Sequence, residues 1–209
     1  MDIAIIGAGN VGGALAGSIS KAGHAVTITA ATPQSAESVA RDTGAKVVAS
    51  NREAVEVGDA VILAVPTTAL DEILGELGDA LDGKIVIDVT NRVSMEDPAS
   101  TIDSTSNAER IQGQIPGARV VKAFNYVFAT RQADPVVDGT PVDGFVAGDD
   151  DDAKAQALDL VGSMGFRPID VGALSMARAL EALASLIISL QVRHDWSWQN
   201  AWKLVGPTK

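Results

Sequence analysis

The amino-terminal stretch MDIAIIGAGNVGGALAGSISKAGHAVTITAAT, residues 1–32, decides the fold. The apolar run Asp2–Ile6 predicts a strand, the Ala-rich segment Asn10–Lys21 predicts a helix, and the β-branched run Ala25–Thr29 predicts a second strand. The glycine-rich loop GAGNVG, residues 7–12, lies between the first strand and the helix. A strand, a G-x-G-x-x-G loop, a helix and a second strand in this order form the βαβ unit that binds dinucleotides.

Each glycine of this loop has its own expected role. Gly7 allows a tight turn, Gly9 lets the backbone approach a pyrophosphate, and Gly12 lets the helix pack closely on the strand. The phosphates would lie against the free N–H groups at the helix N-terminus. A purely structural glycine turn is the alternative. The residues of this loop expected to bind the dinucleotide are Gly7, Gly9, Asn10, Val11 and Gly12.

Strands that are apolar throughout alternate with helical patterns along the rest of the chain. The further expected strands are Lys46–Ala49, Ala60–Val65, Lys84–Val89, Arg119–Ala123, Gly144–Ala147 and Arg167–Val171, and the further helices are Pro33–Asp42, Arg52–Val57, Leu70–Ala80, Thr105–Gln114, Asp151–Met164 and Leu174–Leu190. This order predicts an α/β fold with a Rossmann-type doubly wound, mostly parallel sheet and a C-terminal helical extension. We expect a dinucleotide-binding domain over residues 1–142. Residues 143–209 would form a strand-helix-strand-helix annex packed on the same sheet.

The composition restricts the function further. The chain of 209 residues has no cysteine, two histidines and a net charge of −11. Cysteine chemistry and disulfides are thereby excluded, and a metal site is not expected. The acidic balance argues against nucleic acid or anionic membranes as partners and suits either a high-salt cytoplasm or an ordinary acidic enzyme. With no room for a signal peptide before Asp2, and with the longest apolar helical run, Ala179–Leu190, too short to cross a bilayer, we expect a soluble cytoplasmic protein.

The end of the second strand normally selects the dinucleotide. NAD proteins place an acid there for the ribose, and NADP proteins place an Arg for the 2′-phosphate, whereas this chain has Ala30 and Ala31. The hydroxyls of Thr32 and Ser35, at the start of the next helix, can bind a 2′-phosphate together with the helix N–H groups. This favours NADP(H) over NAD(H). The alternative is that Thr32 only caps the helix that begins at Pro33.

Several segments in one order point to a family. IIGAGNVGGALA, VILAVP (61–66), VIDVTN (86–91), VVKAFN (120–125), VAGDDDDAK (146–154) and GFRPIDVGALSMARALEAL (165–183) together resemble the F-420-dependent NADP oxidoreductases, also called NADPH-dependent F-420 reductases. The resemblance extends from Met1 to about Gly206. It implies hydride transfer between NADP(H) and coenzyme F-420, a 5-deazaflavin.

The same resemblance assigns residues to the cleft. It places Ala64, Val65 and Pro66 beside the nicotinamide and ribose, and it makes Asn91 and Asn125 follow strand ends that face the cleft. Val127 would line the junction of the two rings with Asn125. Turn formation is the alternative role for each asparagine. Phe128 would shape the pocket of the second substrate.

No catalytic side chain stands out. His24 is expected to be structural, His194 to lie on the surface or in packing, and Lys122 to be a solvated lysine at a strand end, with attraction of an anionic substrate as its alternative role. The acidic run Asp149–Asp152 is expected to cap a helix rather than bind metal. Hydride transfer between two bound coenzymes needs alignment more than an acid or base. An NADPH reductase of another acceptor and a non-catalytic nucleotide sensor remain the alternatives.

The carboxyl-terminal region predicts an assembly. The helix Leu174–Leu190 is apolar nearly all round, and all three tryptophans follow it in the tail 191–209. This is more apolar surface than one sheet face needs. We therefore expect a homodimer that packs through this region across a two-fold axis. Burial of the helix wholly within its own subunit, between the sheet and residues 93–117, is the alternative.

Overall fold

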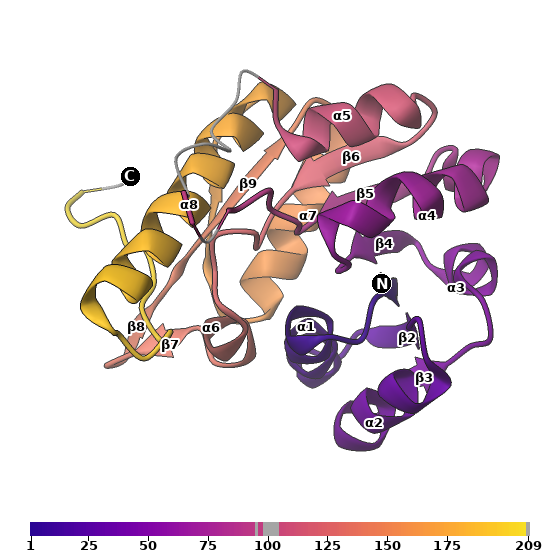
Figure 1. Ribbon diagram of the computed structural model, residues 1–209, viewed down its shortest axis with the longest axis horizontal. Coiled ribbons are helices and arrows are strands. Elements are labelled where there is room, and N and C mark those ends of the chain that lie inside the picture. Colours follow the sequence, from indigo (N-terminus) through magenta and orange to yellow (C-terminus); the bar gives the residue numbers. More distant parts are fainter. Residues whose placement is uncertain (95, 98–104, 208–209) are drawn as a thin grey trace.

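The computed structural model describes residues 1–94, 96–97 and 105–207. The protein has a three-layer α/β architecture, in which helices lie on both sides of a central sheet (Figure 1). The strands of this sheet are β1 (Asp2–Ile6), β2 (Ala25–Thr29), β3 (Lys46–Val47), β4 (Ala60–Leu63), β5 (Ile85–Asp88), β6 (Arg119–Lys122), β9 (Asp143–Gly148) and β10 (Arg167–Asp170). They lie in the order β10-β9-β6-β5-β4-β1-β2-β3.

All neighbouring strands of the sheet run parallel except one pair. β6 and β9 are antiparallel, with Val121 opposite Gly148, and β9 then pairs in parallel with β10. The helices are α1 (Asn10–Lys21), α2 (Pro33–Thr43), α3 (Asn51–Val57), α4 (Leu70–Leu77), α5 (Asn107–Gln114), α6 (Ala129–Ala133), α7 (Asp151–Ser163) and α8 (Ala177–His194). The predicted Rossmann-type, mostly parallel α/β fold is confirmed.

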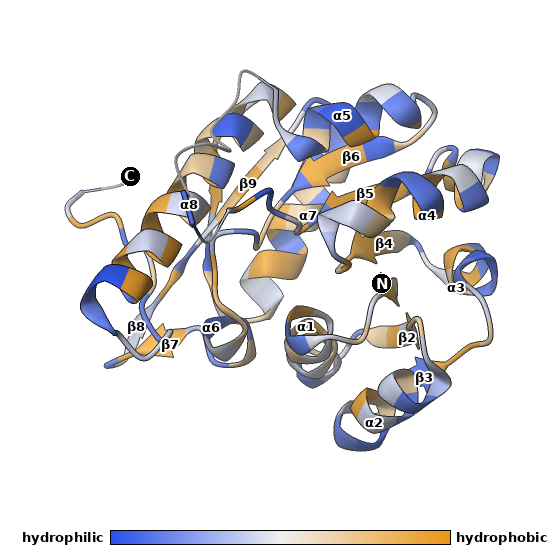
Figure 2. Cartoon of the chain, viewed as in Figure 1, coloured by the Kyte–Doolittle hydropathy of each residue, from blue (hydrophilic) through white to orange (hydrophobic). Residues whose placement is uncertain are grey.

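The core lies on both faces of the sheet because side chains alternate along each strand. In β1, Ile3 and Ile5 pack with α1 and α7 in one apolar cluster, whereas Ala4 and Ile6 pack with α3, α4 and α5 in a second cluster. The central strands are therefore apolar on both sides, and the helices turn their polar faces outward (Figure 2). This is why the strands appear in the sequence as continuous apolar runs.

Two short elements were not predicted from the sequence. α6 covers five residues after β6, and a two-stranded hairpin, β7 (Val136–Val137) with β8 (Thr140–Pro141), follows it. Both are too short to produce a periodic pattern. β9, α7, β10 and α8 extend the sheet beyond β6. A domain division after residue 142 stays a prediction.

The last helix is longer than its apolar run. A 3₁₀ turn, Leu174–Met176, leads into α8, and the combined helix Leu174–His194 is long and apolar enough, by length and composition alone, to cross a membrane. The expectation that it is too short is therefore wrong on length, because polar residues at both ends continue the helix. One such helix is weak evidence for a membrane span, since the core helix of a soluble protein has the same length and composition. The buried side chains of Leu180 and Ala184 pack against the sheet.

Candidate functional site

The glycine loop has the geometry that its sequence predicts. Gly7 has a φ of +111°, which favours glycine, and a Cβ there would collide with the carbonyl oxygen of Ala64. A Cβ at Gly12 would collide with the carbonyl oxygen of Gly7, whereas a Cβ at Gly9 would meet nothing within 4 Å. Two of the glycines are thus required for packing, and the third leaves space open above the loop.

This open space adjoins the start of α1. Gly9 is the N-cap of the helix and provides no side chain to bind the first N–H groups, and no acidic residue stands in the first turn. Such a helix end binds an anion readily, because its N–H groups and dipole both favour negative charge. Asn10, Val11 and Gly12 form this first turn.

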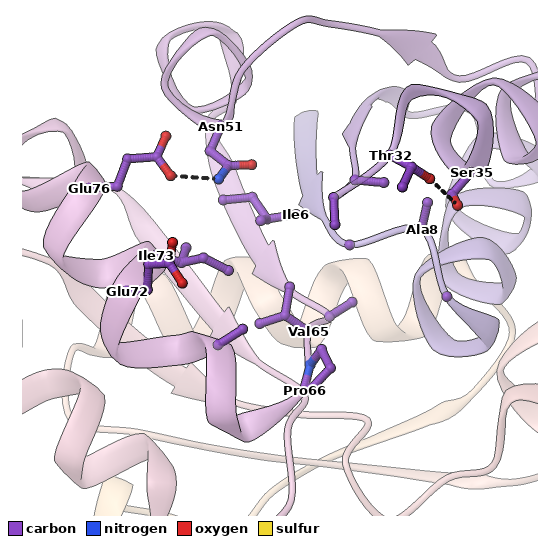
Figure 3. A pocket seen from close by; sticks show the side chains of 16 residues that line it. Ile6, Ala8, Thr32, Ser35, Asn51, Val65, Pro66, Glu72, Ile73 and Glu76 are labelled. Carbon is purple, nitrogen blue, oxygen red and sulfur yellow. Dashed lines mark hydrogen bonds between the residues drawn. The ribbon is translucent and has the colours of Figure 1, made fainter.

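A cavity of about 490 Å³ begins at the glycine loop (Figure 3). Its size is that of a typical site for a small molecule or cofactor. It lies beyond the carboxyl ends of β1, β2 and β4, the expected ligand crevice of an open parallel sheet. The residues that line it are Ile6, Gly7, Ala8, Gly9, Ala30, Ala31, Thr32, Ser35, Asn51, Ala64, Val65, Pro66, Ala69, Glu72, Ile73 and Glu76.

The cavity gathers seven of the predicted site residues. Gly7, Gly9, Thr32, Ser35, Ala64, Val65 and Pro66 line it, whereas Asn10, Val11, Gly12, Asn91, Asn125 and Val127 do not. The hydroxyls of Thr32 and Ser35 are exposed and lie 2.8 Å apart. Thr32 is the N-cap of α2, but its side chain makes no capping hydrogen bond. Both hydroxyls therefore remain near the helix N–H groups, where an anion can bind.

Sequence reasoning missed one wall of the cavity. Ala69, Glu72, Ile73 and Glu76 all line it from α4 and the turn before it, and Asn51 lines it from the start of α3. The signal was present, because the four residues from 69 to 76 have the i, i+3, i+4, i+7 spacing of one helix face directly after the Ala64-Val65-Pro66 segment.

The two predicted asparagines form a reciprocal pair with each other. Asn125 Nδ2 donates to Asn91 Oδ1 over 2.8 Å, and Asn91 Nδ2 donates to the carbonyl oxygen of Asn125 over 2.5 Å. Thr67 Oγ1 donates to the carbonyl of Asn91, which joins the pair to the segment after Pro66. Asn125 is buried, and its Oδ1 has no hydrogen-bond partner. Val127 is buried in the core cluster.

Lys122 corrects a prediction. It is fully buried rather than solvated, and its Nζ donates to Asp88 Oδ2 (2.7 Å), Glu181 Oε1 (2.9 Å) and the carbonyl of Thr90 (2.7 Å). Three acceptors satisfy the three N–H donors of the ammonium group, which makes its burial possible. Asp88 and Lys122 stand opposite each other in the structure. Each is the charged residue at the end of an apolar strand, which is a signal that the sequence contains.

The remaining residues that the sequence singled out have structural partners. The Nε2 of His24 lies 2.9 Å from Ser163 Oγ, and burial together with the amino terminus lowers the pKa of His24. His194 stacks on Trp196, and Asp150 caps α7 by accepting from the Ala153 N–H. Phe128 packs edge-on against Trp198. Within the described part of the chain, no group of His, Cys, Asp and Glu is arranged to hold a metal ion.

A doubly wound parallel sheet with an open glycine loop at its first helix defines a Rossmann-type protein of the dinucleotide-dependent class. Residues 2–92 match the family model of coenzyme F-420-dependent NADP oxidoreductases. The F-420-dependent NADP reductase of Methanothermobacter marburgensis is 32% identical over 211 residues, which cover 93% of this chain and 94% of that protein. The chain therefore belongs to the F-420-dependent NADP oxidoreductase family and is an NADP-dependent oxidoreductase.

One solved structure and one further relative are also similar to this chain. A crystal structure from Arthrobacter sp. FB24, described as a candidate F-420-dependent NADP reductase, matches with a TM-score of 0.84 and 27% identity, over 97% of this chain and 99% of that chain. Metalloreductase STEAP3 of Rattus norvegicus is 31% identical over 182 residues, or 87% of this chain. The match covers 36% of STEAP3, so the chain spans about a third of that relative's length.

Proposed function

We propose that this protein transfers a hydride between NADPH and coenzyme F-420. The similarity to the Methanothermobacter marburgensis enzyme, over almost the whole of both chains, carries the proposal. The residues present fit NADPH, because the space above Gly9 is open and the cavity runs from there to the hydroxyls of Thr32 and Ser35. We assign the pyrophosphate to the loop and first turn of α1, residues 7–12, and the 2′-phosphate to the two hydroxyls.

This reaction requires the protein to align two rings and does not require a catalytic acid or base. NADPH would supply the hydride, coenzyme F-420 would accept it, and a proton from water would balance the reduction of the deazaflavin. Ala64, Val65 and Pro66, which have no ionisable side chain, lie beside the nicotinamide in this proposal. We assign Asn91, Asn125 and Val127 to the same end of the cleft. These residues orient two rings and exclude water, and alignment of this kind lowers the barrier without an acid or base.

Absorbance spectroscopy tests the proposal. NADPH and oxidised F-420 are mixed with the enzyme under anaerobic conditions over a range of pH and salt, since the acidic surface fits a high-salt cytoplasm. The proposal predicts loss of the deazaflavin absorbance band with multiple turnovers. An unchanged band under every condition would contradict it.

A second candidate is reduction of a different acceptor by NADPH. The similarity to rat metalloreductase STEAP3 favours this candidate, because that relative is named for metal reduction. A panel of flavins, quinones, ferric chelates and imines, followed by NADPH oxidation, separates it from F-420 reduction. Turnover with one of these acceptors and none with F-420 would establish it. NADPH binding without turnover on any acceptor would instead indicate a nucleotide sensor.

A further inference from the structure

One polar pair in the cavity has no role in the function proposed above. Asn51 Nδ2 donates to Glu76 Oε2 over 2.9 Å, and Asn51 Oδ1 accepts from Thr29 Oγ1 over 2.7 Å (Figure 3). An ionised carboxylate only accepts hydrogen bonds, so the Nδ2 atom of Asn51 must face Glu76. The buried Thr29 at the end of β2 fixes the other side of the amide. Asn51 therefore holds one orientation.

The pair presents unused hydrogen-bonding groups. An Asn amide nitrogen carries two hydrogens, and Glu76 takes one of them. Within the described part of the chain, no acceptor takes the second hydrogen of Asn51 Nδ2, and no second donor reaches the Glu76 carboxylate. The site thus offers one N–H donor directly beside one carboxylate acceptor.

The surroundings suit a flat base with a polar edge. Ile6, Val65, Ala69 and Ile73 provide apolar walls between the glycine loop and the pair, as the close view shows for Ile6, Val65 and Ile73. Thr32 and Ser35 lie on another side of the cavity, at the N-terminal end of α2. No Lys or Arg is among the residues that line the cavity. A carboxylate in such a place is best matched by a neutral N–H donor at the end of the ligand away from its phosphates.

We propose that Asn51 and Glu76 recognise the Watson–Crick edge of adenine in the bound dinucleotide, an inference that rests on the proposed function. Glu76 accepts from the exocyclic N6 amino group, and Asn51 Nδ2 donates to ring atom N1. Adenine presents a donor next to an acceptor, which is the complement of this pair. Hypoxanthine presents the reverse pattern, with a carbonyl oxygen at position 6 and an N–H at position 1. The pair therefore selects the adenine dinucleotide against its deaminated form.

Titration calorimetry with NADPH and with its hypoxanthine analogue tests this recognition. The wild-type protein should bind the analogue at least about tenfold more weakly, because two hydrogen bonds, one of them to a charged group, become mismatched. In Glu76→Gln the difference should shrink to about threefold or less, because an amide can turn either its oxygen or its nitrogen to the base. Glu76 is exposed, so the variant should fold.

Glu72→Gln is the matched control. Glu72 lines the same cavity from the same helix, and its replacement removes the same charge, but it makes no contact with Asn51 among the described hydrogen bonds. This variant should keep the full discrimination of the wild type. Equal affinities of the wild type for both ligands, or unchanged discrimination in Glu76→Gln, would overturn the inference while leaving NADPH binding intact. Failure of the wild type to bind NADPH would overturn the proposed function as well.

Discussion

At the scale of single residues, the three glycines of the loop are not equivalent. Gly7 and Gly12 are enclosed by backbone carbonyl groups, whereas Gly9 faces open space and has a φ of −80°, which any residue adopts. Sequence spacing alone assigned these roles, and the close contacts support the assignment. Packing does not require the glycine at position 9, and close approach of a pyrophosphate stays its predicted role.

Gly9→Val should remove NADPH binding and leave the fold intact. The valine side chain would occupy the space of the pyrophosphate, and we expect at least about a hundredfold loss of affinity, since close backbone approach is lost. Calorimetry measures the affinity, and thermal unfolding should change by no more than a few degrees. Gly7→Val is the contrasting variant, because its side chain would collide with Ala64 and should prevent stable folding. Unchanged NADPH affinity in Gly9→Val would show that the ligand lies elsewhere.

The contacts of three other residues could not be predicted from the sequence. Asn91 and Asn125 were predicted to follow strand ends that face the same cleft, but their reciprocal hydrogen bonds depend on the exact approach of two loops and were not predicted. Burial of Lys122 depends on Glu181, which is far away in the sequence and reaches the lysine from α8. Local pattern cannot reveal such a long-range partner. A lysine at a strand end is usually solvated, so the ordinary expectation was wrong here.

Lys122→Met should lower the free energy of unfolding by about 3–5 kcal/mol, because removal of one partner leaves buried carboxylates uncompensated. Asp88 is fully buried and Glu181 nearly so, which places the loss in the core. Urea unfolding followed by circular dichroism measures it. The exposed Lys21→Met is the control and should change stability by no more than about 0.5 kcal/mol. A loss below about 1 kcal/mol in Lys122→Met would contradict the buried ion cluster.

At the scale of elements, the strongest sequence patterns gave the most accurate boundaries. The predicted β1, α1 and β2 agree with the structure at both ends, because the glycine loop and Gly23 delimit them. α4 ends at Leu77, earlier than predicted, and a 3₁₀ turn, Gly78–Leu81, continues it. α6 and the β7–β8 hairpin were missed because tertiary contacts, not periodicity, define such short elements. Part of the polar segment 93–117 lies outside the described residues.

The contact between α5 and α8 gives a prediction about pH. Arg178 Nε donates to Glu109 Oε2 over 2.9 Å, and this bond is the main cause that lowers the pKa of Glu109 to about 2. A lowered folded-state pKa stabilises the protein above the unfolded-state value, and the stabilisation is lost as the pH falls toward 2. Wild-type stability should therefore decline between about pH 4.5 and pH 2.

Urea unfolding at several acidic pH values measures this decline. In Glu109→Gln the stability should be lower at pH 6 and should depend less on pH across the same interval, because the titrating group is absent. Glu56→Gln, an exposed residue on α3, is the control and should keep the wild-type slope. Identical slopes for the wild type and Glu109→Gln would show that the contact with Arg178 does not stabilise the fold.

At the scale of the whole molecule, the carboxyl-terminal region remains exposed on one side. Leu186 and Val192 on α8 are about half exposed, at 49% and 55%, and Trp196 and Trp198 follow at 42% and 40%. Large exposed apolar patches usually mark an interaction site on a soluble protein. We therefore propose that α8 and the tail pack against a second copy of the chain. The inner face of α8 is buried in its own subunit, but the exposed side chains show that the alternative of burial wholly within the subunit is wrong, and the dimer stays a prediction.

Sedimentation equilibrium in high salt at micromolar concentration tests the dimer. The wild type should sediment at about twice the chain mass of 21.5 kDa. Leu186→Glu should shift the equilibrium toward the monomer, because it places a charge in the apolar contact. Glu37→Ala, on the exposed face of α2, is a control that should stay dimeric. A wild-type species at the chain mass would rule out the dimer under these conditions.

Isotope transfer shows whether the hydride passes directly from NADPH to the deazaflavin, as we propose. NADPH that carries deuterium at the transferred position of C4 is incubated anaerobically with oxidised F-420 in ordinary water, and the reduced coenzyme is examined by mass spectrometry. Because no protein acid or base handles the hydrogen in this account, one deuterium should appear in the reduced deazaflavin. Reduced F-420 without deuterium, or no reduction of F-420 by an enzyme that binds NADPH, would contradict the account.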